Sequence, residues 1–204
     1  MVYNKTEKIL EKQQLRSQKI IKAVREILSE KDMGKVSIKS IAQKAGIATG
    51  TFYLYFADKE TLIDTVVQEI YQELLEHIKN ERAQYSNGFD KLQATMEVCI
   101  QLFMKEKHLA KTVLVDVPQK NTALNSKYTY IENDLIRLAK IDIDELMDKQ
   151  LIPKQDTLVS AIAFVGAFRE VILSWISTGE PLDSELAQKT LIEYNMRALG
   201  RYII

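Results

Sequence analysis

Proline, glycine and cysteine are scarce in this sequence. Its 204 residues include 3 Pro and 7 Gly, and so few helix-breaking residues favour long helices over a turn-rich β fold. The single cysteine, Cys99, excludes an intramolecular disulfide and is typical of a reducing compartment. We therefore expect a largely helical protein that works in the cytoplasm.

The sequence also lacks the patterns that direct a chain to a membrane. Residues 1–16 carry charges throughout, unlike a signal peptide. The most apolar stretch, residues 158–168, is 11 residues long before it meets Arg169 and Glu170, and a bilayer span needs about 20. We predict no membrane partner.

Motifs of enzymes, cofactors and metal sites are absent too. The sequence has no phosphate-binding glycine loop, nucleophile elbow or Ser-His-Asp arrangement, so an enzyme, the main competing class, has little support and no cofactor is expected. His77 and His108 stand apart from residues at metal-ligand spacing, so we predict no metal. Cys99 falls on an apolar helical face, where a core thiol is the favoured interpretation and a redox sensor the alternative.

Charge is balanced overall but divided unevenly along the chain. Residues 1–60 contain 12 Lys or Arg and 7 Asp or Glu, a net of +5, whereas residues 61–204 contain 16 and 21, a net of −5. This asymmetry indicates a basic module on an acidic body, with the basic part facing a polyanion such as DNA.

The first residues of the chain are rich in lysine. Lys5, Lys8 and Lys12 could form an arm that enters a minor groove. Glu7 and Glu11 lie among them in the sequence, however, so a solvated N-terminal extension is the favoured interpretation.

Hydrophobic periodicity predicts helices throughout the chain. Near the N-terminus we expect a helix at 17–31 ended by a left-handed Gly34, a short helix capped by Ser37 and ended by Gly46, a second short helix at 48–56 and a long helix capped by Asp58. The helices expected in the remainder cover residues 89–105, 107–116, 121–150, 155–177 and 184–202. No strand-like alternation of useful length interrupts them, so the predicted fold class is all-α.

The two short helices at residues 37–56 have a glycine in the turn between them. This is the pattern of a helix-turn-helix, whose second helix enters the major groove of DNA. In that second helix Phe52 and Phe56 are four residues apart and face inward. The opposite surface, around Gly50 and Leu54, is small, hydroxylated or aromatic and has no acidic residue, which suits approach to a phosphate backbone.

The polar residues of this segment suit contact with DNA. A glycine permits close approach to the bases, threonines can bond base edges, tyrosine hydroxyls reach phosphate oxygens, and a lysine in the first turn of a helix adds to its positive end. The predicted DNA-contacting residues are Ser37, Lys39, Thr49, Gly50, Thr51, Tyr53, Tyr55 and Lys59.

The run IAQKAGIATGTFYLYFADKETL, residues 41–62, resembles the DNA-binding signature of the TetR family of transcription regulators. The shared positions are Ile41-Ala42, Ala45-Gly46-Ile47, Gly50, Phe52-Tyr53, Tyr55-Phe56, Lys59-Glu60 and Leu62, and the resemblance covers roughly residues 15–65. It implies DNA contacts by Thr49, Thr51, Tyr53, Tyr55 and Lys59, assisted by Ser37 and Lys39. Ala48 departs from the pattern, which often has a small hydroxylated residue there, so the helix cap is expected to shift to Thr49.

The resemblance also implies two domains. Residues 1–60, with an ordered core at about 15–60, form a three-helix helix-turn-helix domain, and residues 61–204 form a larger helical domain for ligand binding and dimerisation. A helix-turn-helix protein needs a dimer to read two half-sites. The helices near 155–177 and 184–202 are placed like the pair that forms the four-helix dimer interface of TetR-like proteins; the alternative is that both complete a monomer core.

A small-molecule site is expected among the helices between residues 89 and 177. Its candidate lining residues are Met96, Ile100, Phe103, Met104, Tyr128, Ile131, Phe164 and Phe168, which are also ordinary core residues. Asp116 and Glu132 are candidates for recognising a cationic ligand if buried, although solvated carboxylates are the simpler interpretation. The apolar lining favours a lipophilic effector such as a drug or an acyl chain.

By family analogy, we expect a ligand-responsive regulator that binds a palindromic double-stranded operator as a homodimer. Repression is the family's commonest mode, with release when a small lipophilic effector binds. Such an effector must bind the two conformations with different free energies. The alternative is a constitutive regulator or activator without an effector.

Overall fold

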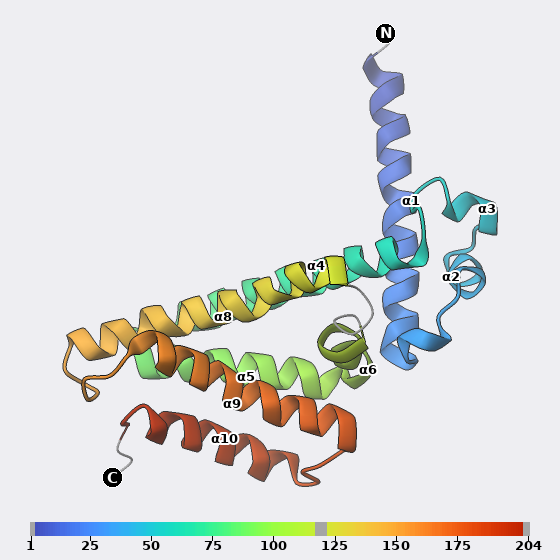
Figure 1. Ribbon diagram of the computed structural model, residues 1–204. Helices are drawn as coiled ribbons and strands as arrows, with labels where there is room; N and C mark the ends of the chain where they lie inside the picture. Colours follow the sequence, from blue (N-terminus) through green and yellow to red (C-terminus); the bar gives the residue numbers. More distant parts are fainter. Residues whose placement is uncertain (1–2, 117–121, 202–204) are drawn as a thin grey trace. The chain divides into compact units, whose positions relative to one another are not determined.

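The computed structural model describes residues 3–116 and 122–201, with side chains for residues 8–116 and 131–201 (Figure 1). The chain divides into two compact units, one up to Ile70 and the other from Tyr71 onward. All regular structure in the described residues is helical, which confirms the predicted all-α class.

The first unit is built from short helices packed on one long helix. Its elements are α1 (Tyr3–Glu30), the 3-10 turn η1 (Met33–Lys35), α2 (Ile38–Ala45), α3 (Thr49–Phe52) and the beginning of α4 (Lys59–Arg82). Helix α1 packs on α2, and α2 packs on α3. Their shared core contains the fully buried residues Ile20, Val24, Leu28, Ile41, Phe52, Leu62 and Val66.

Two features of α1 differ from the sequence-based expectation. The helix begins at Tyr3 rather than near residue 17, because residues 3–16 are mostly Lys, Glu, Gln, Leu and other residues that tolerate a helix, with no glycine or proline among them. It ends at Glu30, and Gly34 lies in η1 without a positive φ, so the prediction of a left-handed terminator there was wrong. The 3-10 turn instead buries Met33 and Val36 in the core of this unit.

The second unit contains the longer helices. Its elements are the rest of α4, α5 (Gly88–Lys105), α6 (Lys107–Lys111), the π-helical turn η2 (Thr112–Asp116), α8 (Thr122–Asp148), α9 (Thr157–Thr178) and α10 (Ser184–Ala198). Side chains of Asn87, Asp156 and Asp183 accept hydrogen bonds from the first turns of α5, α9 and α10. Gly179, with φ +79°, ends α9.

Helix α9 is the central element of the second unit. It packs chiefly on α8 and also contacts α5, α6 and α10. Its buried residues Ala161, Phe164, Val165, Phe168 and Ile172 join one hydrophobic core with the inner faces of α4, α5, α8 and α10.

A charged pair lies at the edge of this core and joins three helices. The Arg82 guanidinium, at the end of α4, donates to both carboxylate oxygens of Asp142 in α8, at 2.6 and 2.9 Å. It also donates to the Thr95 hydroxyl of α5 at 3.1 Å. Asp142 is almost fully buried, and burial raises the pKa of its carboxyl while the hydrogen bonds from Arg82 oppose that change. The pair therefore fixes the end of α4 against α5 and α8.

Candidate DNA interface and ligand-binding body

The helix-turn-helix is defined by its caps. Ser37 caps α2, as predicted, through a capping box in which its hydroxyl accepts from the Ser40 backbone N–H at 3.1 Å and the Ser40 hydroxyl accepts from the Ser37 N–H at 3.1 Å. Gly46 ends α2 in the left-handed conformation, with φ +67°, as expected from its position. The chain then turns into α3 within three residues.

Helix α3 is shorter than the sequence indicated. Its α-helical part covers Thr49–Phe52, and Tyr53–Tyr55 continue it as a turn. Ala48 is the N-cap residue and has no side-chain hydrogen bond, so the expected shift of the cap to Thr49 was wrong. The extended backbone of Ala48 (φ −71°, ψ 147°) already gives the geometry of a cap.

The exposure of α3 side chains separates a packing face from a free face. Phe52 and Phe56 are buried, and the Phe52 ring contacts both Phe56 and Tyr53. Tyr53 is 56% exposed and Leu54 79% exposed, while Thr51 and Tyr55 are half-buried. The structure thus leaves a row of hydroxylated and aromatic side chains without a cover from the chain itself.

Gly50 lies in the exposed part of this helix. A Cβ atom built on Gly50 would meet nothing within 4 Å, so packing within the chain does not require glycine at this position. Its φ is not positive either, which removes a conformational reason for glycine. The helix surface at Gly50 is therefore open, with no side chain between its backbone and solvent.

Lys59 links the start of α4 to the residue before α2. Its ammonium group donates to the Val36 backbone oxygen at 3.1 Å, so the positive charge lies beside the residue that precedes Ser37. Asp58 caps α4, as predicted, by accepting from the backbone and hydroxyl of Thr61, and these hydrogen bonds lower the pKa of its carboxyl. The first turns of two helices, each with free N–H groups, are therefore held near one lysine.

Comparison with known proteins identifies the family. Residues 20–66 match the family model described as "Bacterial regulatory proteins, tetR family". These residues contain the DNA-binding region of the TetR family, as the sequence indicated. The relatives that the chain matches are transcription regulators rather than enzymes.

Individual relatives resemble this chain over different lengths. The uncharacterized HTH-type transcriptional regulator YvdT of Bacillus subtilis (strain 168) is 45% identical over 62 residues, which is 30% of this chain and only 32% of that protein. The fatty acid metabolism regulator protein of the same organism is 21% identical over 175 residues, 85% of this chain and 90% of the relative. The crystal structure of the transcriptional regulator FadR from Bacillus subtilis in complex with stearoyl-CoA has a TM-score of 0.76 at 20% identity, covering 91% of this chain and 99% of that one.

In the second unit, most predicted pocket residues come together. Met96, Ile100, Phe164 and Phe168 are buried in one hydrophobic cluster, and Phe103, Met104 and Ile131 pack against it from its edge. Tyr128 lies in α8 among residues 122–130, whose side chains are outside the described part of the structure. The grouping is what a ligand-binding core requires, although a packed core has it as well.

A small cavity lies beside this cluster, with a volume of about 10 Å³. Its lining residues are Ile100, Phe103, Met104, Lys107, Ile172, Trp175 and Ile176. The first three were predicted and the other four were missed. Periodicity could have found those on α9, because Ile172 and Trp175 or Ile176 continue the row of Phe164 and Phe168 at helical spacing.

The acidic candidates lie apart from this cavity. Glu132 has a nearby cation within the chain, Arg169, at 3.9 Å, and Asp116 is half-buried in η2. Neither lines the cavity, so the geometry gives no support to recognition of a cationic ligand there. Among the residues that the structure describes, no group of three or more His, Cys, Asp or Glu could hold a metal ion.

Cys99 is fully buried in the cluster. Burial in apolar surroundings raises the pKa of its thiol to about 12, and the thiolate is the reactive form of cysteine. We expect native protein at neutral pH to react with a thiol-specific reagent only as fast as the core opens, and protein in denaturant to react at once. Rapid labelling of the folded protein would contradict this and revive the redox alternative.

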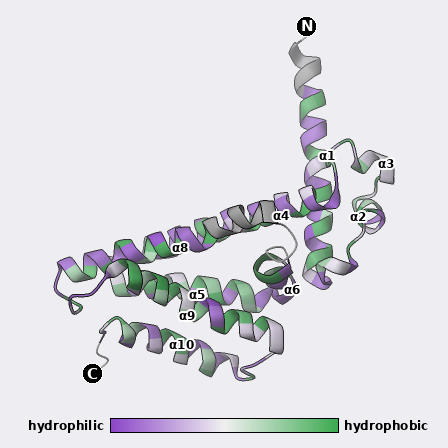
Figure 2. Cartoon of the chain, viewed as in Figure 1, coloured by the Kyte–Doolittle hydropathy of each residue, from purple (hydrophilic) through white to green (hydrophobic). Residues whose placement is uncertain are grey.

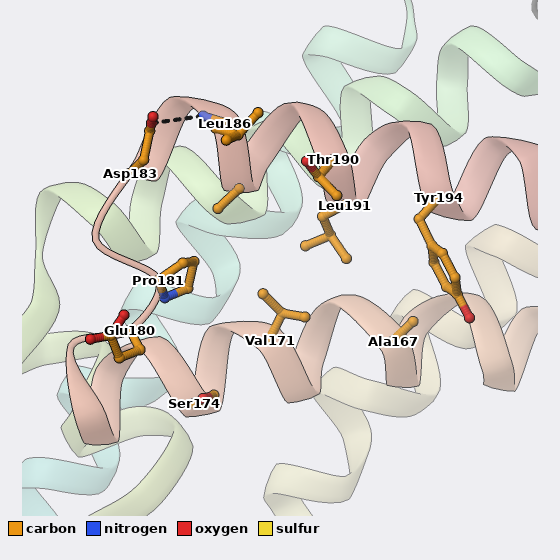
Figure 3. Close-up of a pocket in the computed structure, with 11 residues that line it drawn as sticks. Ala167, Val171, Ser174, Glu180, Pro181, Asp183, Leu186, Thr190, Leu191 and Tyr194 are labelled. Carbon is orange, nitrogen blue, oxygen red and sulfur yellow. Dashed lines mark hydrogen bonds between the residues drawn. The ribbon is translucent and has the colours of Figure 1, made fainter.

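A groove of about 790 Å³ runs between α9 and α10 (Figure 3). Ala167, Val171 and Ser174 of α9 lie on one side of it, and Leu191 and Tyr194 of α10 on the other. Leu186 is 60% exposed at its rim. The groove is therefore an apolar surface that the chain itself leaves partly uncovered.

Helix α9 is more apolar as a whole than its 11-residue run suggested. Figure 2 shows hydrophobic residues along most of its length, and by length and composition it could cross a membrane, with a mean hydropathy of 1.7 although only 33% of that stretch is buried. Core helices of water-soluble proteins pass the same test. The exposed remainder includes Leu158, Val159 and Ile162, so α9 has apolar surface on more than one face.

Proposed function

We propose that this chain is a dimeric repressor that binds a palindromic operator and is released by a long-chain acyl-CoA. The observation that carries the DNA-binding part is the exposed face of α3, where Thr49, Gly50 and Tyr53 are uncovered beside the buried Phe52. We propose further contacts from Thr51 and Tyr55 of the same helix and turn, and from Ser37, Lys39 and Lys59, of which Lys59 reaches the Val36 backbone oxygen. This action on DNA belongs in the cytoplasm.

The acyl-CoA part is supported by the chemistry of the small cavity. Its walls are apolar except for Lys107, which is exposed at α6 and adds a positive charge where the cavity meets solvent. An apolar interior beside a cation suits a molecule with a hydrocarbon tail and an anionic head. The similarly folded FadR structure from Bacillus subtilis holds a molecule of this class, stearoyl-CoA.

The described conformation has too little space for an acyl chain. A volume of about 10 Å³ holds roughly one water molecule, so binding must expand the core between α5 and α9. Methionine side chains such as Met96 and Met104 repack readily, and a π-helical turn such as η2 often marks a functional site. Because the expanded and closed states differ in affinity for the ligand, acyl-CoA would shift the protein between them.

The dimer is proposed to form through α9 and α10. Leu186→Glu would place a charge on the exposed rim of the groove. In a symmetric dimer each copy would bring one such charge into the interface, where an unpaired charge is costly. We expect the dimer dissociation constant to rise about a hundredfold or more, with helical content unchanged, as measured by sedimentation and circular dichroism. The matched control is Ile141→Glu on α8, 55% exposed, which should remain dimeric. Equal dissociation constants for the two variants would place the interface elsewhere.

The experiment that tests the proposed function is selection of bound sequences from random duplex DNA, followed by titration with stearoyl-CoA. We expect a palindrome bound by a dimer, with an affinity that falls steeply as salt rises, and release by stearoyl-CoA but not by coenzyme A alone. Failure to recover a preferred sequence from folded dimer would contradict specific regulation. Operator binding that is unchanged by stearoyl-CoA would contradict the effector and support a constitutive regulator.

A further inference from the structure

We infer that the N-terminal half of α1 is a second DNA-binding element. Its basic face consists of Lys8, Lys12, Arg16 and Lys19, and we assign to it the phosphates of the duplex that flanks the sequence read by α3. The inference rests on the DNA binding proposed above and adds an interaction that the helix-turn-helix does not provide.

The helical backbone of this segment gathers the four charges on one side. They follow one another at spacings of 4, 4 and 3 residues, which confines them to an arc of about 80° along about 16 Å of helix. All four residues are exposed. Glu11, which in the sequence lies between Lys8 and Lys12, is about 100° around the helix from the centre of the basic face. Glu11, one of the two acidic residues that argued against a DNA-binding arm in the sequence, therefore lies to one side of the basic face.

The excess of positive charge in residues 1–60 is concentrated at the beginning of the chain. Residues 1–25 contain 7 Lys or Arg and 2 Asp or Glu, a net of +5, whereas residues 26–60 contain 5 of each, a net of zero. The helix-turn-helix itself, residues 37–56, contains two lysines and no acidic residue, a net of +2. Since attraction to phosphates depends on positive charge, the first half of α1 would add substantially to the attraction of this unit to DNA.

The described contacts give the basic face no role in stabilising the chain. Residues 8–16 are all exposed, and burial on α1 begins in earnest at Ile20. Like charges four residues apart repel each other, and an unpacked helix of this length is marginal in water. A polyanion along the face would remove the repulsion and stabilise the helix. In Figure 1 this half of α1 extends beyond α3, which belongs to the same compact unit.

The test compares two variants of the full chain that have the same net charge. The first replaces the basic face with glutamine (K8Q, K12Q, R16Q and K19Q), and the control replaces four exposed lysines of the second unit outside α9 and α10 (K79Q, K105Q, K149Q and K154Q). Binding is measured at several salt concentrations on two duplexes, one holding the selected operator alone and one extended by about one helical turn at each end.

Wild type and control should bind the extended duplex more tightly than the short one. The basic-face variant should bind the extended duplex about tenfold or more weakly than wild type does, with a salt slope that falls by about 0.9 for each phosphate that the variant no longer neutralises. It should also fail to distinguish the two duplexes.

Two results would overturn the inference. The first is equal DNA affinity and equal salt slope for the two variants, while wild type binds the operator. This result would leave the proposed function intact, whereas failure of wild type to bind DNA would reject the proposed function itself. The second is a basic-face variant that binds DNA as wild type does but no longer binds phosphatidylglycerol vesicles, which wild type does bind. That result would assign the basic face to an anionic membrane, with exposed Ile9 and Leu10 as its apolar contacts.

Discussion

Arg82→Ala is expected to lower the free energy of unfolding by about 3–5 kcal/mol. The substitution removes both hydrogen bonds to Asp142, which is 1% exposed, and leaves its carboxylate buried without its hydrogen-bonded countercharge. It also removes a donor to Thr95 and so weakens the joint of α4, α5 and α8. Urea denaturation followed by circular dichroism measures the change.

A surface pair of the same residue types supplies the control. Arg137 lies 3.0 Å from Asp134, but its side chain is 71% exposed, so Arg137→Ala should cost no more than about 1 kcal/mol. The double variant Arg82→Met with Asp142→Leu should recover part of the loss, because it removes both buried charges. Similar losses for Arg82→Ala and Arg137→Ala would show that burial does not set the strength of the pair.

The effect of Arg82→Ala should also depend on pH. Burial already raises the pKa of Asp142 in the folded protein, and loss of the guanidinium raises it further. A raised carboxyl pKa destabilises the fold where the group is ionised, and the deficit shrinks as pH falls through the folded-state value and the carboxyl takes up a proton. We therefore expect a smaller difference from wild type in mildly acidic buffer than at neutral pH, as measured by denaturation at each pH.

Local chemistry made the first unit largely predictable from sequence. Ser37, Gly46 and Asp58 act where expected because a cap depends on a few neighbouring atoms. Gly34 misled the prediction because the burial of Met33 and Val36, a tertiary effect, determines the turn there. The start of α1 was missed because residues 3–16 have helix propensity without an apolar stripe, and periodicity detects only the stripe.

The second unit shows the limit of periodicity more clearly. Periodicity correctly grouped Met96, Ile100, Phe164 and Phe168 in one core, because the inward face of each helix can be recognised from that helix alone. The volume left between α5 and α9 depends on how those faces meet, and no single helix carries that information. Lys107 and Trp175 reach the cavity from different helices, 68 positions apart in the sequence, so only the fold brings them together.

Tyr53→Ala is expected to weaken operator binding about 100- to 10,000-fold while leaving the fold and the dimer unchanged. A hydrogen bond to a charged group contributes about 1.5–3 kcal/mol, which is roughly ten- to a hundredfold, and a dimer on a palindrome has two copies of the residue. Tyr53 is the cleaner probe of the interface than Lys59, because Lys59 also donates to Val36 and its loss would disturb the start of α2. Electrophoretic mobility shift and fluorescence anisotropy measure the affinity.

Two further variants separate the parts of this effect. Tyr53→Phe retains the ring contact with Phe52 but loses the hydroxyl, so it should account for most of the loss if the tyrosine acts by bonding a phosphate. Tyr85→Ala removes another exposed tyrosine, outside the helix-turn-helix, and should bind as wild type does. If Tyr53→Ala binds the operator with wild-type affinity, the exposed face of α3 is not the surface that contacts DNA. The ring contact with Phe52 could not compensate for a lost hydrogen bond to phosphate.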